Sequence, residues 1–324
     1  MVSKIEITDL KLLRGAVVVS AGGHLEQALR RVTQLNLQSN TTFIIPKNAQ
    51  SESKLSNQNH LFMANVASRD YLGLCKAIIQ LIKILNKKDF DYVLSTGAGV
   101  AFACFIVCKF KRINFFYIES IARVQTPSLT GKMLALFQSS NLYTESVYFD
   151  SRKWKKIETF FSDYSLQKSL GNRRNPQELK IFVTVGTVHK YKFQRMVDLV
   201  RSVLTSRDDV IWQIGDTRSS HLPGTVHREL SEVEIARKVD WADVVITHSG
   251  VGSILNILDR GKYPIIIPRL SNYGEHVDDH QIEIASKISK LGLGLVIFDS
   301  LVRENLIDAL NSKIVNKGTN FYIE

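Results

Sequence analysis

The sequence has little cysteine and no apolar run long enough to cross a membrane. Its three cysteines cannot all pair with one another and none lies in a CxxC motif, which fits a reducing compartment. The longest apolar run covers residues 100–110, roughly half of the ~20 residues that a transmembrane helix needs. Residues 1–14 carry five charged side chains and lack the apolar segment of a secretory signal. We therefore expect a cytoplasmic protein that does not span a membrane.

Negative charge is scarce in the first half of the chain. Residues 1–160 contain 21 lysines and arginines against 11 acidic residues, whereas residues 161–324 contain 21 against 20. The excess either keeps the protein soluble or attracts the first half to an anionic membrane surface, where each well-placed basic residue contributes about 1 kcal/mol. The usual nucleic-acid-binding motifs are missing, and we expect no nucleic-acid partner.

Strand-like and helix-like segments alternate along the chain, which is typical of parallel α/β sheets. The length of 324 residues favours two domains. We expect an N-terminal domain at 1–161, a polar linker at 162–180 and a C-terminal domain at 181–324. The expected strands are 16–20, 42–45, 61–64, 92–95, 114–118, 141–145, 181–185, 210–214, 244–247, 264–267 and 295–298. The expected helices are 25–35, 70–87, 99–109, 128–139, 191–204, 231–239, 250–260, 276–291 and 301–313.

Two doubly wound Rossmann-like domains in tandem predict a ligand cleft at the carboxyl ends of both sheets. In the second domain, one strand ends at Thr247 and a helix begins near Gly250 after a turn of small residues. The first amide groups of a helix have no internal partners, and its dipole is positive there, so a phosphate is a suitable ligand. The same turn could also be purely structural.

The following strand leads to a second polar loop, at residues 268–281. Its histidines and carboxylates are suitable metal ligands, but acidic residues also favour the first turn of a helix. A third interpretation is sugar recognition, because carboxylates and amides hydrogen-bond to several hydroxyl groups at once. The residues concerned are Glu275, His276, Asp278, Asp279, His280 and Gln281.

The first domain opens with a strand, a Gly22-Gly23 turn and His24. A lone histidine is usually structural, but one at the carboxyl edge of the sheet, with a pKa near neutrality, is a candidate general base. Residues 96–99, 118–123 and 128–132 follow strands at the same edge. The D-x-D motif at residues 89–91, a pattern typical of metal-dependent transferases, precedes its strand and is expected at the opposite edge.

Residues 241–281 resemble the donor domain of glycosyltransferase family 28, which includes the MurG enzymes of peptidoglycan synthesis. The resemblance is strongest to the catalytic subunit of the two-subunit dolichol-pathway N-acetylglucosaminyltransferase, and residues 183–187 look like its opening strand and turn. The first half is similar to the membrane-recruiting subunit. Bacterial capsule and exopolysaccharide clusters encode similar pairs as separate proteins, which this chain resembles in fused form. The motifs of the first half are residues 20–24, 95–99, 119–123 and 128–132.

The resemblance implies a GT-B fold and inverting, metal-independent transfer from a UDP-sugar to a sugar on a polyprenyl diphosphate, at the cytoplasmic membrane face. It implies no cofactor, and His24 would be the catalytic base. The implied acceptor-binding residues are Gly22, Gly23, Gly97, Gly99, Glu119, Arg123 and Lys132. The implied donor-binding residues are Gly186, Thr187, His248, Ser249, Gly250, Val251, Gly252, Ser253, Asn256, Arg269, Glu275, His276, Asp279, His280 and Gln281.

The transferred sugar is less well defined. MurG-like sequences grip the ribose with a glutamate where this chain has Asn256, which can still hydrogen-bond a hydroxyl group but lacks the charge. Similar proteins transfer glucuronic acid, galactose or N-acetylglucosamine. We favour glucuronic acid, because Arg269 or His280 could meet its carboxylate. Two rival functions are a sugar-nucleotide epimerase and a non-catalytic nucleotide-sugar-binding scaffold.

Overall fold

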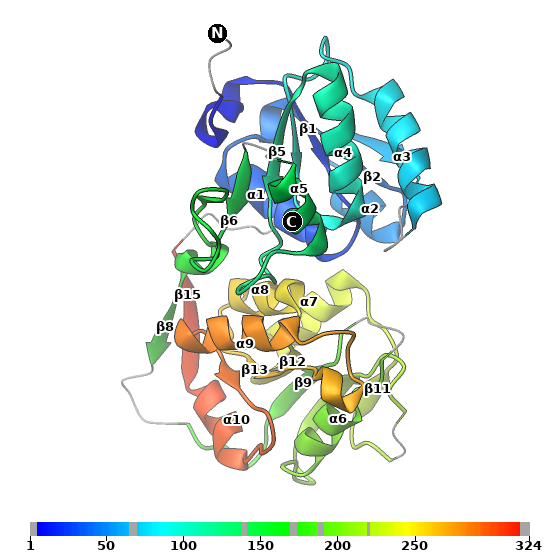
Figure 1. Ribbon diagram of the computed structural model, residues 1–324. Coiled ribbons are helices and arrows are strands. Elements are labelled where there is room, and N and C mark those ends of the chain that lie inside the picture. Colours follow the sequence, from blue (N-terminus) through cyan, green and yellow to red (C-terminus); the bar gives the residue numbers. More distant parts are fainter. Residues whose placement is uncertain are drawn as a thin grey trace. The chain divides into compact units, whose positions relative to one another are not determined.

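The computed structural model describes residues 5–64, 70–137, 141–168, 174–186, 191–218 and 221–317. The chain divides into two compact units, Met1–Thr159 and Phe160–Glu324 (Figure 1). Each unit is built around a parallel β-sheet with helices packed against it. No helix in these described ranges combines the length and the apolar character needed to cross a bilayer.

The first unit contains a seven-stranded parallel sheet in the order β3-β2-β1-β4-β5-β6-β7. Its strands are β1 (Gly15–Val18), β2 (Thr41–Pro46), β3 (His60–Met63), β4 (Tyr92–Ser95), β5 (Asn114–Ile118), β6 (Leu142–Thr144) and β7 (Lys155–Lys156). Its helices are α1 (Gly23–Gln34), α2 (Ala49–Lys54), α3 (Tyr71–Ile84), α4 (Ala98–Lys111) and α5 (Leu129–Leu136), with 3-10 helices η1 (Ile7–Leu12) and η2 (Gln38–Asn40).

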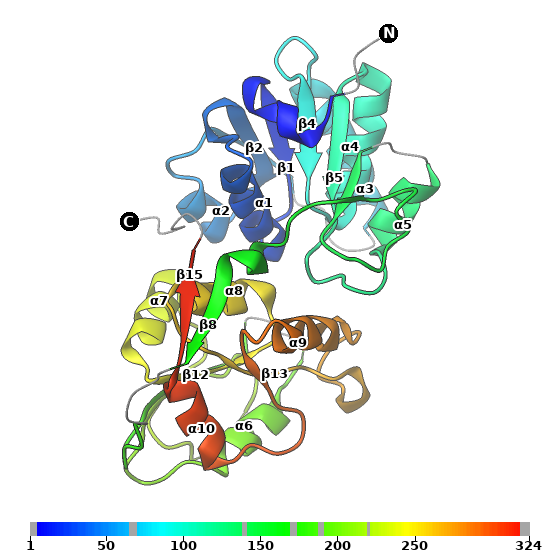
Figure 2. The same cartoon turned by 90° about the vertical axis from the view of Figure 1, so that its left-hand side faces the viewer.

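Both faces of this sheet are covered by apolar side chains from helices. α3, α4 and α5 pack on one face, and η1 and α1 pack on the other. Figure 2 shows α1 and α2 on one side of the strands and α3 and α4 on the other. Burial on both faces explains why β1, β4 and β5 read as continuous apolar runs in the sequence.

The second unit contains a six-stranded parallel sheet, in the order β11-β10-β9-β12-β13-β14, and a two-stranded antiparallel sheet, β15-β8. The strands are β8 (Tyr164–Lys168), β9 (Lys180–Thr184), β10 (Asp209–Gln213), β11 (Thr225–His227), β12 (Val244–His248), β13 (Ile265–Ile267), β14 (Leu295–Val296) and β15 (Ser312–Asn316). The helices are α6 (Gln194–Arg201), α7 (Glu232–Trp241), α8 (Val251–Asp259), α9 (His280–Lys290) and α10 (Arg303–Leu310), with 3-10 helices η3 (Phe160–Asp163) and η4 (Ser271–Tyr273).

Each sheet has one point where the strand order reverses. In the first unit β1 and β4 are neighbours, and in the second unit β9 and β12 are neighbours. The loops that leave such a pair diverge to opposite faces of the sheet, and ligands of open α/β sheets bind in the space between them. The fold therefore predicts that ligands bind near the loops after β1, β4, β9 and β12.

The expected doubly wound α/β fold is confirmed, and every expected strand and helix is present with ends shifted by a few residues. Two local expectations are wrong. The polar segment 48–59, where the sequence leads us to expect no helix, contains α2, because Asn48 and Ser51 exchange side-chain and backbone hydrogen bonds of 2.8 and 2.9 Å that cap this helix. The helix expected at 301–313 ends at Leu310, and β15 follows it.

The predicted linker also needs correction. Residues 164–168 form β8, which pairs with β15 near the end of the described chain. The unit boundary accordingly falls between Thr159 and Phe160, before the predicted linker begins. This short polar strand is stabilised by a partner about 150 residues away, so the local sequence carries no signal for it.

Candidate functional site

The first candidate group lies where β1 and β4 end, and its central side chain is His24. The Nδ1 atom of His24 lies 2.9 Å from the carbonyl oxygen of Thr96, and the Thr96 hydroxyl donates to the His24 carbonyl at 2.9 Å. A carbonyl oxygen only accepts, so Nδ1 carries the proton of this hydrogen bond. In the neutral imidazole the lone pair is consequently on Nε2, the tautomer that a general base needs.

Gly97 makes room for this imidazole. Its φ of +137° is a conformation that residues with a side chain rarely adopt, and a Cβ there would lie 2.4 Å from Cε1 of His24. A Cβ on Gly22 or Gly23, by contrast, would meet no described atom within 4 Å. Gly22 and Gly23 at the start of α1 thus leave open space, whereas Gly97 fits closely against the imidazole of His24.

Burial lowers the pKa of His24 from its usual value, and the hydrogen bond to Thr96 only partly opposes this effect. The imidazole is therefore neutral at physiological pH. A neutral imidazole with an oriented lone pair can accept a proton, which is the role of a general base that the sequence predicts for His24.

Glu119 has a structural role that the sequence did not indicate. One carboxylate oxygen accepts from the Tyr117 hydroxyl and the Ser120 amide at 3.0 and 2.8 Å, and the other accepts from the amide and hydroxyl of Ser128 at 2.9 and 3.1 Å. Gly131 packs against the same carboxylate. Burial raises the pKa of Glu119. With four hydrogen bonds inside the protein, this carboxylate holds the segment after β5 in place.

The other predicted acceptor residues follow the carboxyl ends of the same strands. Gly99 lies in the first turn of α4, Arg123 is half-buried in the turn after β5, and Lys132 is exposed in the first turn of α5. The D-x-D motif lies at the opposite edge, as expected: Asp91 accepts from the backbone and side chain of Arg14 just before β4.

The second candidate group lies where β9 and β12 end. After His248 the chain turns through Ser249 and enters α8, whose N-cap is Gly250, and no described side chain caps the first turn. A Cβ on Gly252 would meet no described atom within 4 Å. The uncapped amides and the open approach fit an anionic ligand such as a phosphate. Thr187, which the sequence also places here, lies outside the described residues.

His248 joins the two loops of this group. A Cβ on Gly186 would lie 2.5 Å from Cε1 of His248, and a Cβ on Gly250 would lie 2.2 Å from its Nε2. The imidazole is thus wedged between two glycine backbones. Burial, together with the charge of Arg269, lowers the pKa of His248 to about 3, so the ring is neutral.

Several buried polar atoms around this turn have no hydrogen-bond partner among the described residues. Folded proteins rarely leave such atoms unpaired, because each costs about 1–3 kcal/mol. Their concentration at one turn indicates a place where a polar ligand or water completes the hydrogen bonding. The atoms are Thr247 Oγ1, His248 Nδ1, Ser249 Oγ and Asn256 Oδ1.

Arg269 does not have the ligand-binding position that the sequence suggested. Its side chain is fully buried, and its guanidinium donates to the carbonyl oxygens of Val185, Tyr191 and Glu275 at 2.9–3.1 Å. It also stacks over the Phe193 ring at 4.5 Å. Arg269 therefore organises the loops after β9 and β13 and does not present a cation to a ligand carboxylate.

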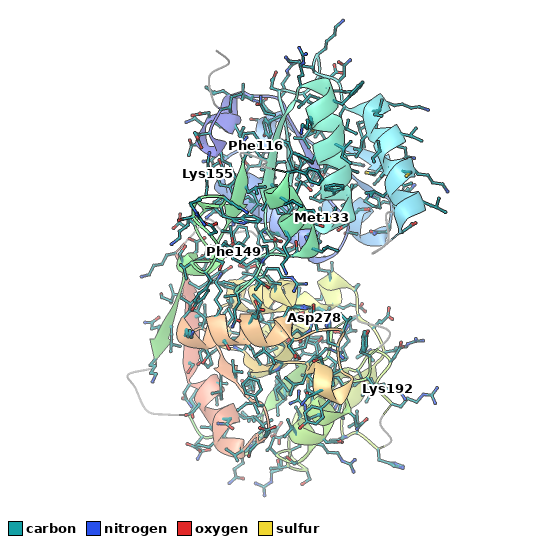
Figure 3. The ribbon with its side chains drawn as sticks, in the orientation of Figure 1. Phe116, Met133, Phe149, Lys155, Lys192 and Asp278 are labelled. Atoms are coloured by element: carbon teal, nitrogen blue, oxygen red, sulfur yellow. The ribbon has the colours of Figure 1, made fainter. Side chains whose placement is uncertain are left out.

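Glu275, Asp279 and Gln281 also have partners within the second unit. Glu275 forms a buried ion pair with Arg195 of α6 at 2.9 Å, which the sequence gave no signal for. Asp279 accepts from the amide and hydroxyl of Ser271, each at 2.8 Å, and Gln281 Oε1 accepts from the Arg269 amide at 3.0 Å. These side chains fix the shape of the loop before α9. Figure 3 labels Asp278, which belongs to this loop.

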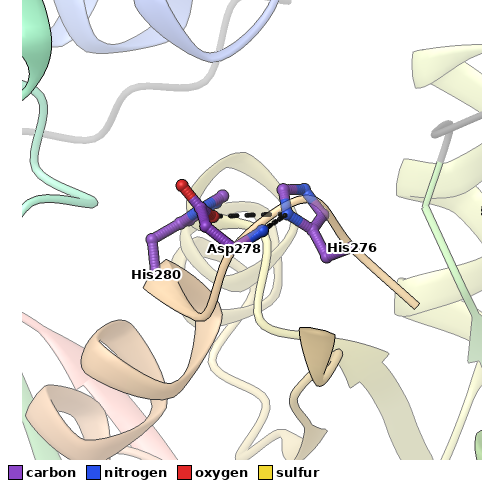
Figure 4. Close-up of side chains that lie close together, drawn as sticks. All are labelled: His276, Asp278 and His280. Atoms are coloured by element: carbon purple, nitrogen blue, oxygen red, sulfur yellow. Dashed lines mark hydrogen bonds and ion pairs between the residues drawn. The ribbon is translucent and has the colours of Figure 1, made fainter. Parts of the chain in front are cut away.

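His276 and His280 converge on Asp278 in that loop (Figure 4). The Nδ1 atom of each ring faces the same carboxylate oxygen, at 3.4 Å for His276 and as a close contact for His280. The two rings lie 4.6 Å apart, edge to face. Of the three interpretations of this loop, the metal site and sugar recognition both remain compatible with this cluster, which precedes and includes the first residue of α9.

The second unit is similar to a known protein family. Residues 180–321 match the model of the glycosyltransferase family 28 C-terminal domain. A UDP-N-acetylglucosamine–N-acetylmuramyl-(pentapeptide) pyrophosphoryl-undecaprenol N-acetylglucosamine transferase of Prochlorococcus marinus is 22% identical over 78% of this chain and 72% of its own. The Coxiella burnetii protein of the same name is 24% identical over 72% and 67%.

Among solved structures, Acinetobacter baumannii MurG superposes with a TM-score of 0.58 at 17% identity, covering 91% of this chain and 88% of its own. Agreement at this level of identity supports the fold, while the match to residues 180–321 supports the family of the second unit. The chain has the GT-B fold, and residues 180–321 of its second unit match the glycosyltransferase family 28 C-terminal domain.

Proposed function

We propose that this glycosyltransferase moves a sugar from a UDP-sugar to a sugar carried on a polyprenyl diphosphate, with inversion at the anomeric carbon. The observation that carries the donor half is the segment from the end of β12 into α8, where four buried polar atoms have no hydrogen-bond partner among the described residues and no described side chain caps the helix start. The acceptor class rests on the relatives, whose names specify a pyrophosphoryl-undecaprenol substrate.

The donor diphosphate would lie at the first turn of α8. Its leaving charge would be stabilised by the helix amides and by the hydroxyl groups of Thr247 and Ser249, which are in place before the reaction begins. Preorganised donors of this kind need neither a metal nor a cofactor. Asn256, whose Oδ1 has no partner among the residues that the structure describes, would accept a hydrogen bond from a ribose hydroxyl.

The acceptor hydroxyl would give its proton to Nε2 of His24. As the hydroxyl oxygen bonds to the anomeric carbon, the bond from that carbon to the diphosphate oxygen breaks and UDP leaves with the electron pair. One displacement inverts the centre, so an α-linked donor gives a β-linked product. Thr96 would keep the other ring nitrogen protonated throughout.

The identity of the sugar follows less directly from the contacts. The expectation of glucuronic acid rested on Arg269 or His280, but the first is buried on backbone carbonyls and the second contacts the carboxylate of Asp278. Neither presents an unopposed cation to a uronate. UDP-N-acetylglucosamine, which the names of the relatives contain, is therefore the first donor to test, followed by the galactose and glucuronic acid donors.

The first unit would hold the enzyme at an anionic membrane surface. A groove of about 460 Å³ between α4 and α5 is lined by Phe102, Phe105, Ile106, Lys109, Phe110 and Phe137. Phe110, which lines it, is 79% exposed, and Leu136, which precedes the lining residue Phe137 in the chain, is 76% exposed. Lysine and aromatic groups together suit a surface that is both charged and apolar.

The basic segment 152–156 is a second possible membrane contact, but ion pairs within the first unit already engage part of its charge. Arg152 pairs with Asp150 at 3.1 Å, and Lys155, on β7, pairs with Glu6 at 2.6 Å. The helix expected at 128–139 contributes α5 to the groove. We therefore place the membrane contact on α4 and α5.

The proposed function is tested by incubating the protein with each UDP-sugar and a synthetic glucosyl-diphosphate lipid, then identifying the product and its anomeric configuration. A β-linked disaccharide lipid and free UDP are expected. An altered sugar nucleotide formed without acceptor would identify an epimerase instead, and donor binding without turnover would identify a scaffold. An α-linked product would contradict the single displacement.

A further inference from the structure

We propose that His276, Asp278 and His280 form a binding site for one divalent transition-metal ion, with Zn²⁺ as its probe. The three side chains come from one loop and the first residue of α9, and all are partly exposed. One ligand atom from each lies within 4.8 Å of the others. Two imidazoles and one carboxylate are one of the three-ligand sets with which zinc keeps a fourth position open.

The spacing fits such an ion with small side-chain movements. Ligand atoms about 2.0–2.1 Å from a tetrahedral ion are about 3.3 Å apart. The Nδ1 of His276 is 3.4 Å from Oδ1 of Asp278, which already matches. The contact from His280 to the same oxygen is shorter and would lengthen as the ion takes the place of the shared hydrogen bond. The backbone amide of Asp278, which donates to Nδ1 of His276 at 3.4 Å, would give up this long hydrogen bond to the ion.

The ring of His276 is held in position before any ion binds. Tyr191 stacks on it at a centroid distance of 5.8 Å and an angle of 26°, and the His280 ring meets it edge to face at 4.6 Å. These ring contacts reduce the side-chain freedom that would otherwise be lost when an ion binds.

Binding of the ion would also regulate the enzyme, and this regulatory part of the proposal rests on the proposed function. His280 begins α9, directly after the loop for which sugar recognition is one interpretation, so an ion that binds its imidazole would withdraw it from a donor sugar bound there. Zn²⁺ would then inhibit transfer, whereas removal of metal would leave transfer intact. Through such a site a bound metal ion inhibits the enzyme but takes no part in the displacement itself.

The test measures Zn²⁺ binding to the full chain, stripped with chelator, by calorimetry without donor or acceptor. We expect one ion per chain. Replacing His276 or His280 by alanine, or Asp278 by asparagine, should weaken binding by more than about a hundredfold, beyond the roughly 10–100-fold that loss of an outer partner costs. Asp278→Asn keeps the side-chain shape but removes the anionic ligand. The matched control is His221→Asn, because His221 is exposed, outside the cluster, and at a φ of 61° that asparagine tolerates.

No binding by the wild-type chain, or equal binding by all four variants, would overturn the site. Thermal melts without metal show whether each variant is folded. The regulatory part is checked separately, as the ratio of transfer rates with and without Zn²⁺ in each protein. If the wild-type enzyme binds Zn²⁺ but is not inhibited, the regulatory part of the proposal is refuted and the binding site stands. A protein that binds Zn²⁺ but transfers no sugar would contradict the proposed function alone.

Discussion

A Cβ atom on residue 97 would lie 2.4 Å from Cε1 of His24, so the two residues can occupy their positions only if residue 97 is glycine. Gly97→Ala should therefore push the imidazole away from Thr96 and misplace the base. We expect turnover to fall by about a hundredfold or more, as general-base loss does, with the dissociation constant of the UDP-sugar unchanged. Steady-state kinetics and donor titration measure both quantities.

The control for this variant is the double mutant. Because Gly97→Ala is expected to act through His24, it should lower turnover little further in a His24→Ala background. A second loss as large as the first would show that residue 97 acts by another route. Thermal unfolding of each protein separates this effect from the strain of a side chain at a φ of +137°.

His24 also predicts how activity depends on pH. Protonated imidazole cannot accept a proton, and burial lowers the pKa of His24 below 6.5. The value of kcat/KM should therefore stay constant as the pH falls to about 6.5 and decline only in more acidic solution. His24→Ala should lower kcat/KM by about a hundredfold and abolish this acidic decline. An unchanged pH profile in the variant would assign the decline to another group.

Transfer should not depend on a divalent metal. The D-x-D motif lies at the amino edge of the first sheet with Asp91 bound to Arg14, and the amides of α8 are placed to stabilise the leaving diphosphate. Initial rates in excess EDTA should equal those without it. A loss that manganese or magnesium restores would mean that a metal stabilises the leaving group.

His248 should make the stability of the second unit sensitive to acid. Its pKa is about 3 in the folded protein and about 6.5 when unfolded, so the unfolded chain takes up the proton first. Stability is complete above pH 6.5 and is lost as the pH falls towards 3, by up to about 1.4 kcal/mol per pH unit. Chemical denaturation of wild type and His248→Gln from pH 7 to 4 measures the difference. Equal pH slopes in the two proteins would refute this role.

The positions of both candidate groups could be predicted because their signals are local. A strand, a turn of small residues and a helix start occur within a few residues at both His24 and Gly250. The roles of individual side chains depended on partners far away in the sequence. Arg269 donates to carbonyl oxygens near residue 190, and Glu275 forms an ion pair with Arg195. Neither partner can be inferred from the spacing of residues along the sequence. β8 was missed for the same reason, since its partner is β15.

The last prediction concerns the membrane contact of the first unit. Attraction of lysines to anionic lipid is screened over about 8–10 Å at ordinary salt, whereas apolar contact is not weakened by salt. The protein should sediment with anionic vesicles, bind less to neutral ones and be partly released by high salt. Replacing Phe110 and Leu136 together by serine should remove most of the salt-resistant fraction, because both side chains are exposed beside the α4–α5 groove.

Val233→Ser is the matched control, since Val233 is an exposed apolar residue on α7 of the second unit. It should leave vesicle binding unchanged. The Phe110 and Leu136 variant should keep its activity on a short, water-soluble acceptor, because these side chains lie outside both candidate groups. Equal binding to neutral and anionic vesicles would rule out charge as the tether. If the serine variant and the control bind alike, the groove is not the contact, and the basic segment 152–156 becomes the surface to neutralise.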